Sequence, residues 1–409
     1  SITKAFAGVA IMQLVEQGKL DLSKSLSTYL PDLPPTWQDL TIKQLMSHTS
    51  GLPAILANDV GALISNEGPD AAWKLVQTLP MEFPTGTRFK YNQTNYLLVG
   101  KIIEALSGEA FAEFIKDNQL HKVDMPRTDQ AGFNNLNDVI SHSARRYTYY
   151  YDRTLANIKT ETFSPMLHPA SGMSSTATEL AEWIIALQNG QLLKNPSSIA
   201  ELWQPAILNN GQTQGFSNQL NGYALGWPVL VREKHPAVAP VGGNRSAFFI
   251  YPQDELAIVV LSNLMGGAPD QFIDDIAGFY IPEMTKENGF GLPPNIKALY
   301  HTLEAKGYDK IISIVREEKL EFSEDELNGW GYWLIAQEKT EQALEVFLLN
   351  TTLFPNSANT YDSLAETYLS LNKMSQALTS YEKALELQPN SHYMKSQLGK
   401  IRALQKVEN

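Results

Sequence analysis

The first four residues hold a serine and a lysine at a spacing that suits nucleophilic catalysis. Ser1 and Lys4 are separated by two residues, and residues 1–17 show the apolar spacing of a helix. A lysine three residues after a serine lies one helical turn along the same face. Burial would favour the neutral form of that lysine, which could then accept the proton of the serine hydroxyl. The pair therefore indicates a nucleophile and its base, provided that other residues complete a site.

The same spacing also has a purely structural explanation. A serine at the start of a helix is above all an N-cap residue. Ser370 and Lys373 share the spacing, as do Ser380 and Lys383, in stretches with no other sign of catalysis. The spacing by itself leaves both interpretations open.

The composition limits the classes of function. The 409 residues are enough for more than one domain, and 43% hydrophobic with 19% charged residues is typical of a soluble globular protein. A net charge of −12 disfavours nucleic acids and anionic membranes as partners. The absence of cysteine excludes disulfides, thiolate metal sites and cysteine nucleophiles. No apolar run is long enough to span a bilayer. We expect no transmembrane segment, no metal and no cofactor.

The first two thirds of the chain mix helical and strand patterns. Helices are predicted at 1–17, 41–47, 70–79, 95–106, 177–187 and 269–281. Strands are predicted near 223–232, 245–251 and 255–262, and the short turns between them favour antiparallel hairpins. The stretch 130–168 is irregular. It contains an aromatic cluster that we interpret as packing or as the lining of a substrate cleft, namely Tyr147, Tyr149, Tyr150 and Tyr151.

The last third of the chain contains an internal repeat. The residues Ala343, Leu344, Phe347, Leu353, Pro355, Asn356 and Ser357 recur at Ala377, Leu378, Tyr381, Leu387, Pro389, Asn390 and Ser391. The period from Ala343 to Ala377 is 34 residues. The pattern resembles the tetratricopeptide repeat, with two units at about 325–358 and 359–392 and a degenerate one near 296–324.

The repeat resemblance implies a possible protein or peptide partner for residues 296–409. Two clear units are few for independent stability. We therefore expect this segment to rest on the preceding domain or on a second protomer, with Trp330, Tyr332 and Trp333 as candidate contacts.

Four further stretches accompany Ser1–Lys4, and they are Leu45–Pro53, Phe89–Tyr96, Tyr223–Trp227 and Pro240–Gly243. In this order they resemble the motifs of the serine β-lactamase and penicillin-binding-protein family, especially its branch of class C β-lactamases, D-amino-acid peptidases and esterases. The resemblance covers residues 1–281. It implies an α+β fold, with an antiparallel sheet flanked by helices and a helical subdomain, and a periplasmic or secreted location. We expect a hydrolase domain at 1–284, a linker at 285–295 and the repeats at 296–409.

The resemblance also implies a mechanism of acyl transfer. Ser1 would attack the carbonyl of an ester or amide and form an acyl-enzyme. Lys4 would accept or relay the serine proton, and Tyr91 would pass a proton to the leaving group and then activate water. A charge on Lys4 is expected to lower the pKa of Tyr91.

The remaining site residues follow from the same resemblance. The backbone amides of Ser1 and Gly243 would form the oxyanion hole. The substrate-binding residues would be Gln93, Gly242 and Asn244. His48 lies in the second motif, beside Thr, Ser and Gly, and we interpret it as a hydrogen-bonding residue that fixes a turn.

Two residues depart from the family's pattern. Gln93 stands where the family usually has asparagine, and Pro240 stands where a lysine or histidine is usual. Proline has neither charge nor N–H, although Arg245 or Lys234 could compensate. This difference favours esterase or amidase chemistry over efficient β-lactam hydrolysis.

Two other functions compete with the serine hydrolase. The chain could be a binding scaffold on an inactive hydrolase fold, with the repeats as its working part. Ser1 could also be an N-terminal nucleophile whose own amine is the base, although that mechanism would not need Lys4 or Tyr91. In the resembling family the nucleophile follows a helix and the first strands of the sheet. We therefore expect that N-terminal strands are missing here, and that residues 1–409 alone are poorly soluble or inactive.

Overall fold

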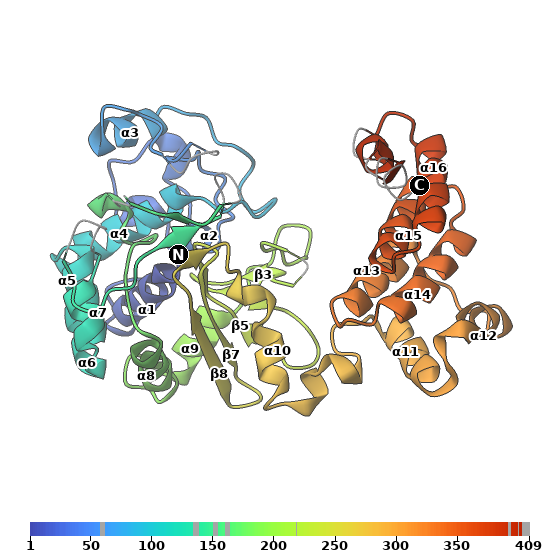
Figure 1. The fold of residues 1–409 in the computed structure, drawn as a ribbon. Helices are drawn as coiled ribbons and strands as arrows, with labels where there is room; N and C mark the ends of the chain where they lie inside the picture. The colour runs from blue at the N-terminus through green and yellow to red at the C-terminus, as the bar shows by residue number, and fades with distance from the viewer. Residues whose placement is uncertain are drawn as a thin grey trace. The chain divides into compact units, whose positions relative to one another are not determined.

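The computed structural model describes residues 1–57, 62–133, 139–149, 154–159, 164–217, 219–391, 394–399 and 401–402. The chain divides into two compact units, Ser1–Tyr280 and Ile281–Asn409 (Figure 1). The division into a hydrolase domain, a linker and repeats stays a prediction. Within the described ranges, no helix is long and apolar enough to cross a membrane.

Ten α-helices are described in the first unit. They are α1 (Thr3–Glu16), α2 (Ile42–Met46), α3 (Pro69–Val76), α4 (Gln93–Ser107), α5 (Phe111–Ile115), α6 (His121–Val123), α7 (Pro126–Ala131), α8 (Ala177–Gln188), α9 (Pro196–Trp203) and α10 (Ile273–Gly278). A π-helical turn, η3 (Lys116–Leu120), joins α5 to α6. Short 3₁₀ turns are η1 (Leu26–Thr28), η2 (Pro35–Trp37), η4 (Pro165–Leu167) and η5 (Pro269–Gln271).

Side-chain caps explain where several predicted helices begin. The Thr41 side chain accepts a hydrogen bond from the Gln44 backbone, and the Gln44 side-chain oxygen accepts one from the Thr41 backbone, so α2 begins with a capping box. The Asn92 side chain accepts from the Thr94 backbone at the start of α4, and Gly108 ends that helix in the left-handed conformation. The five helices predicted before residue 190 are confirmed. The sixth, at 269–281, is instead the turn η5 followed by the shorter α10.

The main sheet of the first unit is antiparallel. Its strands are β3 (Gly222–Tyr223), β4 (Pro228–Leu230), β5 (Ala237–Val238), β6 (Val241–Gly242), β7 (Ser246–Tyr251) and β8 (Leu256–Leu261). The hairpin of β7 and β8 runs from the pair Ser246 and Leu261 to the pair Tyr251 and Leu256. Because β8 occupies one edge of β7 along its whole length, β5 and β6 pair with the other edge. Figure 1 shows α8 and α10 on either side of β7 and β8.

A second, smaller sheet takes two of its three strands from the stretch 130–168, which the sequence suggested to be irregular. It consists of β1 (Tyr147–Thr148), β2 (Ala156–Asn157) and β9 (Leu264–Met265). Strand β1 is antiparallel to β2 and parallel to β9. Tyr150 and Tyr151 of the aromatic cluster lie outside the described residues.

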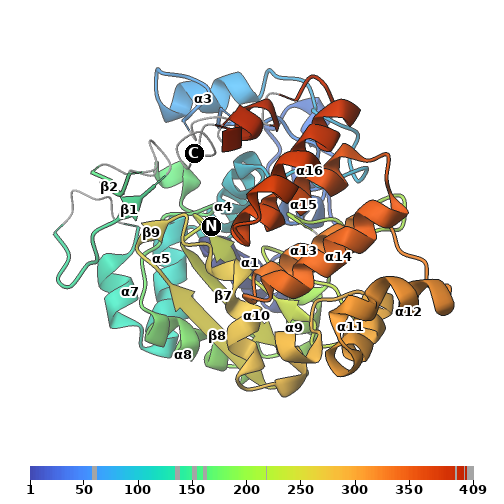
Figure 2. The ribbon, with the colours of Figure 1, turned by 45° about the vertical axis from the view of Figure 1, so that its right-hand side comes forward.

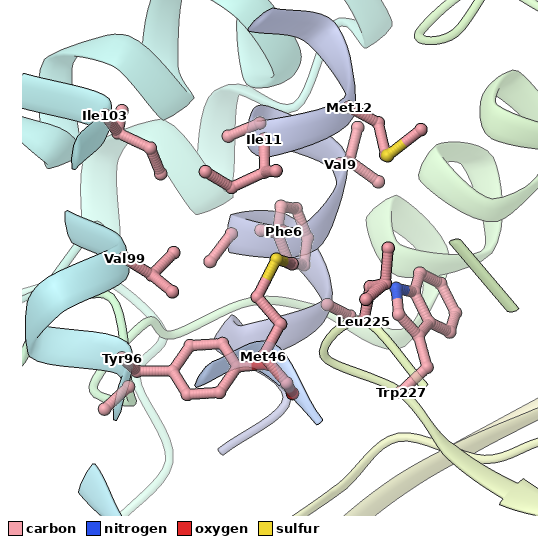
Figure 3. Close-up of a cluster of buried hydrophobic side chains, with 14 of the residues drawn as sticks. Phe6, Val9, Ile11, Met12, Met46, Tyr96, Val99, Ile103, Leu225 and Trp227 are labelled. Carbon is pink, nitrogen blue, oxygen red and sulfur yellow. The ribbon is translucent and has the colours of Figure 1, made fainter. Parts of the chain in front are cut away.

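The core of the first unit joins α1 to the other helices and to the main sheet. Phe6 of α1 stacks on Trp183 of α8 with 4.1 Å between ring centroids, and Trp183 stacks on Trp227 at 6.0 Å. Trp227 in turn meets Phe248 of β7 edge-on. Figure 3 shows Phe6 between the side chains of Met46 and Tyr96 on one side and those of Leu225 and Trp227 on the other. The first helix is thus held by apolar contacts on several sides.

The second unit consists of helices. They are α11 (Pro294–Lys306), α12 (Ile311–Glu317), α13 (Glu324–Ile335), α14 (Thr340–Leu353), α15 (Ala358–Ser370) and α16 (Met374–Leu387), with 3₁₀ turns η6 (Pro282–Met284), η7 (Lys286–Asn288) and η8 (Tyr308–Lys310). Helix α13 packs on α14, and α15 packs on α16 (Figure 2). Residues 394–399 and 401–402 are helical.

The three aromatic residues proposed as contacts of the second unit are engaged within it. Trp330 is only 1% exposed and belongs to that unit's hydrophobic core, so its expected role as a surface contact is wrong. The Tyr332 hydroxyl lies within hydrogen-bond distance of Glu366 Oε2, at 2.8 Å, and of Ser363 Oγ, at 3.1 Å. The Trp333 indole donates to the Phe290 carbonyl at 3.3 Å. A tryptophan at helical spacing was more readily a core residue than a docking residue.

Candidate active site

The serine of the first motif faces a tyrosine from a distant part of the chain. Helix α1 begins at Thr3, and its N-terminus carries no side-chain cap, so the N-cap explanation of Ser1 is wrong. The Tyr91 hydroxyl donates a hydrogen bond to Ser1 Oγ at 2.7 Å. The Lys4 backbone N–H donates to the Ser1 carbonyl at 3.1 Å. Ser1 is therefore held on both its side chain and its backbone.

Lys4 is a buried cationic residue next to this pair. Its side chain is 1% exposed. Its Nζ donates to Gln93 Oε1 at 2.8 Å and to the Ala170 carbonyl at 2.7 Å, and it lies 4.6 Å from the centroid of the Tyr91 ring. Burial lowers the pKa of Lys4 well below its ordinary value. The site therefore favours a neutral amine, as a base requires.

Tyr91 immediately precedes the Asn92 cap of α4, so the start of that helix sets its position. Burial raises the pKa of Tyr91 to about 12, and hydrogen bonds with Ser1 and Gln93 only partly oppose this shift. The expectation that Lys4 lowers this pKa is therefore wrong, because a neutral lysine offers no charge for the phenolate. At neutral pH Tyr91 is therefore protonated, and its hydroxyl donates the hydrogen bond to Ser1 Oγ.

Two glycines let the main sheet and its turns approach α1 closely. A Cβ on Gly226 would lie 2.4 Å from the Lys4 carbonyl oxygen, and the residue has a φ of +97°. A Cβ on Gly242, in β6, would lie 3.0 Å from the Ser1 nitrogen. Both predicted motifs, at 223–227 and at 240–243, therefore act by bringing backbone against the first turn of α1.

The turn after β6 holds the other two residues of the predicted oxyanion and substrate sites. Gly243 and Asn244 both have a left-handed backbone, with φ values of 57° and 51°. The Asn244 carbonyl accepts hydrogen bonds from the Gly266 and Ala268 backbones. Gly243 faces the cavity described next, whereas Asn244 is not among the described residues that line it.

A cavity of about 1080 Å³ opens in front of Ser1. Among the predicted site residues, Gln93, Gly242 and Gly243 line it together with Ser1, while Lys4 and Tyr91 do not. Backbone and hydroxyl groups of the loop at 170–175 form another part of its wall. Ser1 thus faces open space, whereas Lys4 and Tyr91 are not among the described residues that line this space.

The charged groups around this cavity are arginines. Arg146 and Arg245 are among its lining residues, and no aspartate or glutamate is found among those that the structure describes. Of the two cations considered as substitutes for Pro240, Arg245 lines the cavity. Lys234 is exposed in the turn between β4 and β5 and does not. Tyr147 and Tyr149, the two described residues of the aromatic cluster, are also absent from the described lining. These two tyrosines therefore do not line the cavity.

This architecture can be compared with known proteins. Residues 1–281 match the family model described as Beta-lactamase. The chain belongs to the β-lactamase family. Protein flp of Staphylococcus aureus strain MW2 is 27% identical over 271 residues, which are 64% of this chain and 52% of that protein. Penicillin-binding protein 4* of Bacillus subtilis strain 168 is 26% identical over 288 residues, covering 64% and 59%. This member of the β-lactamase family thus spans about half the length of the curated relatives it matches.

Solved structures share the fold of this β-lactamase family member. The crystal structure of a penicillin-binding protein from Bacillus halodurans has a TM-score of 0.55 and 25% identity, covering 68% of this chain and 83% of that one. A D-stereospecific amidohydrolase from Streptomyces sp. has a TM-score of 0.55 and 19% identity, covering 68% and 84%. At that identity, the second likeness shows the fold alone.

One contact in this β-lactamase-family site was not foreseen from the sequence. The Ala170 carbonyl binds Lys4, and every residue carries such a group, so no sequence signal marks it. His48 was interpreted as a turn-fixing residue, and this is confirmed by its φ of 58° and by its bond from the Asn92 backbone. Within the described residues, no cluster of histidine and acidic side chains could hold a metal ion.

Proposed function

We propose that this protein is a serine hydrolase that cleaves an ester or amide through an acyl-enzyme on Ser1. The observation that carries the proposal is the 2.7 Å hydrogen bond from Tyr91 to Ser1 beside a buried lysine. A nucleophile, a hydroxyl hydrogen-bonded to it and a nearby amine with a lone pair at neutral pH are the parts that acyl transfer needs.

The protonation states support a division of labour between the two partners of Ser1. Tyr91 has too high a pKa to be the base by itself, while the lowered pKa of Lys4 leaves its amine lone pair available. As Ser1 attacks the carbonyl carbon, the Tyr91 hydroxyl turns from donating to Ser1 Oγ to accepting the Ser1 proton, and it passes its own proton to the neutral amine of Lys4. The return of a proton through Tyr91 to the leaving group completes acylation. Water then repeats the sequence to release the acid and regenerate Ser1.

The oxyanion of the tetrahedral intermediate needs hydrogen-bond donors near Ser1. The backbone N–H groups of Ser1 and Gly243 are the proposed donors. Gly242 supports this assignment, since its strand approaches the Ser1 nitrogen so closely that a Cβ there would lie only 3.0 Å from that nitrogen. Gln93 binds Lys4 and also lines the cavity, so we propose that it links the base to the substrate.

The substrate class follows from what stands beside Ser1. Pro240, the residue before β6, is buried and uncharged, so the position where the family usually has a lysine or histidine offers no cation, and the cations at the cavity are Arg146 and Arg245. We therefore favour esterase or peptidase activity over efficient β-lactam hydrolysis. Similarity to penicillin-binding proteins and to a D-stereospecific amidohydrolase makes D-amino-acid amides and peptides suitable members of a substrate panel. A periplasmic or secreted location agrees with the family resemblance and belongs to the same proposal.

A second proposal concerns the C-terminal unit. We propose that its helix pairs are tetratricopeptide-like hairpins that bind a peptide or protein. The packed pairs α13 with α14 and α15 with α16 coincide with the two sequence units. Gly331 supports this, because Phe347 of the partner helix fills the space where a side chain would be. If turnover were absent, this scaffold function would be the remaining candidate.

The test of the hydrolase is covalent labelling. A fluorophosphonate should modify the wild-type protein at Ser1, as located by peptide mass spectrometry, and turnover of a nitrophenyl ester should be lost in Ser1→Ala. Ser370→Ala is the matched control, since Ser370 and Lys373 have the same spacing and the Ser370 hydroxyl instead donates to the Glu366 carbonyl. Label on another residue, or wild-type turnover in Ser1→Ala, would reject the proposal.

A further inference from the structure

We propose that His48 is a positioning residue that holds Tyr91 against Ser1, acting as a neutral imidazole with its proton on Nε2. It does so by hydrogen-bonding the chain on both sides of Tyr91. The inference rests on the proposed function, because the position of Tyr91 matters for catalysis only if Tyr91 transfers protons.

The contacts of His48 enclose Tyr91 along the chain. The His48 carbonyl accepts a hydrogen bond from the Lys90 backbone at 3.0 Å. Its ring Nδ1 accepts one from the Asn92 backbone at 3.2 Å. Its ring centroid lies 4.5 Å from that of Tyr91. One residue therefore fixes the residue before Tyr91, the residue after it and the ring between them.

The hydrogen-bond donors decide which ring nitrogen of His48 carries the proton. A backbone N–H can only donate, so the bond from Asn92 requires Nδ1 to be an acceptor. Asn95 Nδ2 lies 3.0 Å from the same Nδ1, and Ser50 donates to the other end of that amide, Asn95 Oδ1, at 2.6 Å. The amide nitrogen is thereby turned toward the imidazole. The single proton of the neutral ring is then on Nε2.

The surroundings also disfavour the charged form of His48. The residue is fully buried, and its Nε2 has no hydrogen-bond partner among the described residues. Burial lowers the pKa of His48 well below its ordinary value. A protonated ring would lose the acceptor at Nδ1 and release Asn92. We call the contacts of His48 with Lys90, Tyr91 and Asn92 the clamp. The clamp is complete only when the His48 ring is neutral.

The local backbone explains why a histidine can stand at this position. His48 follows α2 and has a left-handed backbone with φ of 58°. Histidine and asparagine adopt this conformation more often than most other residues. Tyr96 of α4 donates to the Met46 carbonyl at 2.8 Å, so α2 and α4 are joined next to His48. The packing of these two helices therefore sets where Tyr91 lies.

Two substitutions of His48 distinguish the role of the hydrogen-bond acceptor at Nδ1 from the role of the rest of the ring. In His48→Asn the side-chain oxygen can occupy the place of Nδ1, whereas in His48→Gln the amide reaches the place of Nε2 and leaves Nδ1 unreplaced. Both remove the ring from Tyr91. We expect kcat for a nitrophenyl ester within about threefold of wild type in His48→Asn, and about 10²-fold lower in His48→Gln, as for a misplaced catalytic group. KM should change by less than about twofold in both.

A backbone control and an activity-independent readout complete the design. His235→Gln places the same residue in another left-handed position, with φ of 51°, whose ring instead contacts Asp254. It should keep the wild-type kcat. Amide hydrogen exchange, resolved to single residues by fragmentation mass spectrometry, should show about tenfold less protection of Asn92 in His48→Gln. Protection of Lys90 should stay unchanged, because its bond goes to the His48 backbone.

The outcomes distinguish this inference from the proposed function. An active wild type with equal kcat in the two His48 variants, or with unchanged Asn92 protection in His48→Gln, would overturn the clamp and keep the hydrolase. A wild type that neither turns over the ester nor is labelled at Ser1 would reject the hydrolase. The clamp would then survive as a structural statement only if Asn92 loses protection in His48→Gln and keeps it in His48→Asn.

Discussion

Replacement of Lys4 by methionine should separate the catalytic role of this residue from its effect on stability. Methionine has a similar length and no charge, and it would leave two acceptors unused, at Gln93 and Ala170. Both residues line the cavity, but the Gln93 side chain can turn to water, whereas Ala170 is only 1% exposed. The lost bond at Ala170 costs about 1–3 kcal/mol at every pH.

The pH dependence of the free energy of unfolding tests more directly whether Lys4 is neutral in the folded protein. The unfolded chain binds the Lys4 proton with an ordinary pKa of 10.5, while folding lowers that pKa because the side chain is buried. Between the lowered value and 10.5 the unfolded state therefore binds more protons. The free energy of unfolding of the wild type should rise with pH in that window, by up to about 1.4 kcal/mol per pH unit. The variant lacks this group. The free energy of unfolding of Lys4→Met minus that of wild type should be largest near pH 7 and should decrease as the pH rises toward 10.5.

The assay is urea unfolding of both proteins at several values of pH between about 7 and 10.5, with turnover of a nitrophenyl ester measured alongside. Turnover should fall at least about 10²-fold in Lys4→Met. Lys19→Met, which removes an exposed lysine just after α1, reports on the loss of one positive charge alone. The buried tyrosines near Lys4 are common to all three proteins and cancel in the comparison. Parallel stability curves for wild type and Lys4→Met would mean that folding leaves Lys4 charged, and would refute its role as base.

Three further predictions concern the site and the second unit. Tyr91→Phe keeps the ring and removes the hydroxyl, so kcat should fall by about 10²–10⁴ with little change in melting temperature; a smaller loss would exclude Tyr91 from proton transfer. Neutral short-chain esters should be turned over faster than cephalosporins, and Pro240→Lys should raise kcat/KM for carboxylate-bearing substrates; efficient cephalosporin hydrolysis by the wild type would contradict this. Gly331→Ala should destabilise the second unit by about 1–3 kcal/mol, since its Cβ would lie 2.4 Å from the Phe347 ring. Gly329→Ala in the same helix meets nothing within 4 Å and should stabilise it by about 0.5–1 kcal/mol, so equal effects in calorimetry would disprove the packing argument.

The sequence predicted those parts of the fold that have a periodic pattern and a cap. Helix α4 has both, with Asn92 before its apolar positions and Gly108 after them, and it was placed within two residues at its start. Strands β7 and β8 extend over six residues each, and their positions were also predicted. Strands β1, β2, β5 and β9 have two residues each, which is too short for any alternation to appear.

The site was predictable in its residue types and less so in its electrostatics. The pairing of Tyr91 with Ser1 followed from motif resemblance and has a direct counterpart in the structure. The direction of the Tyr91 pKa shift was predicted wrongly, because it depends on burial and on a neutral Lys4, and neither is visible in a motif. The Ala170 contact depends on a backbone carbonyl, which only three-dimensional proximity can identify.

The contacts that build the site also join residues far apart in the chain. Tyr91 and Ser1 are separated by 90 positions, Lys4 and Gln93 by 89, and Lys4 and Ala170 by 166. Closing loops of such length has a large entropic cost that must be met before the contacts contribute, so pairings of this kind form slowly during folding. No short segment of the chain can assemble the nucleophile with its partners. During refolding, recovery of esterase turnover should therefore lag behind the recovery of the helical circular dichroism signal. Turnover would then measure the fraction of molecules in which the first unit has folded completely.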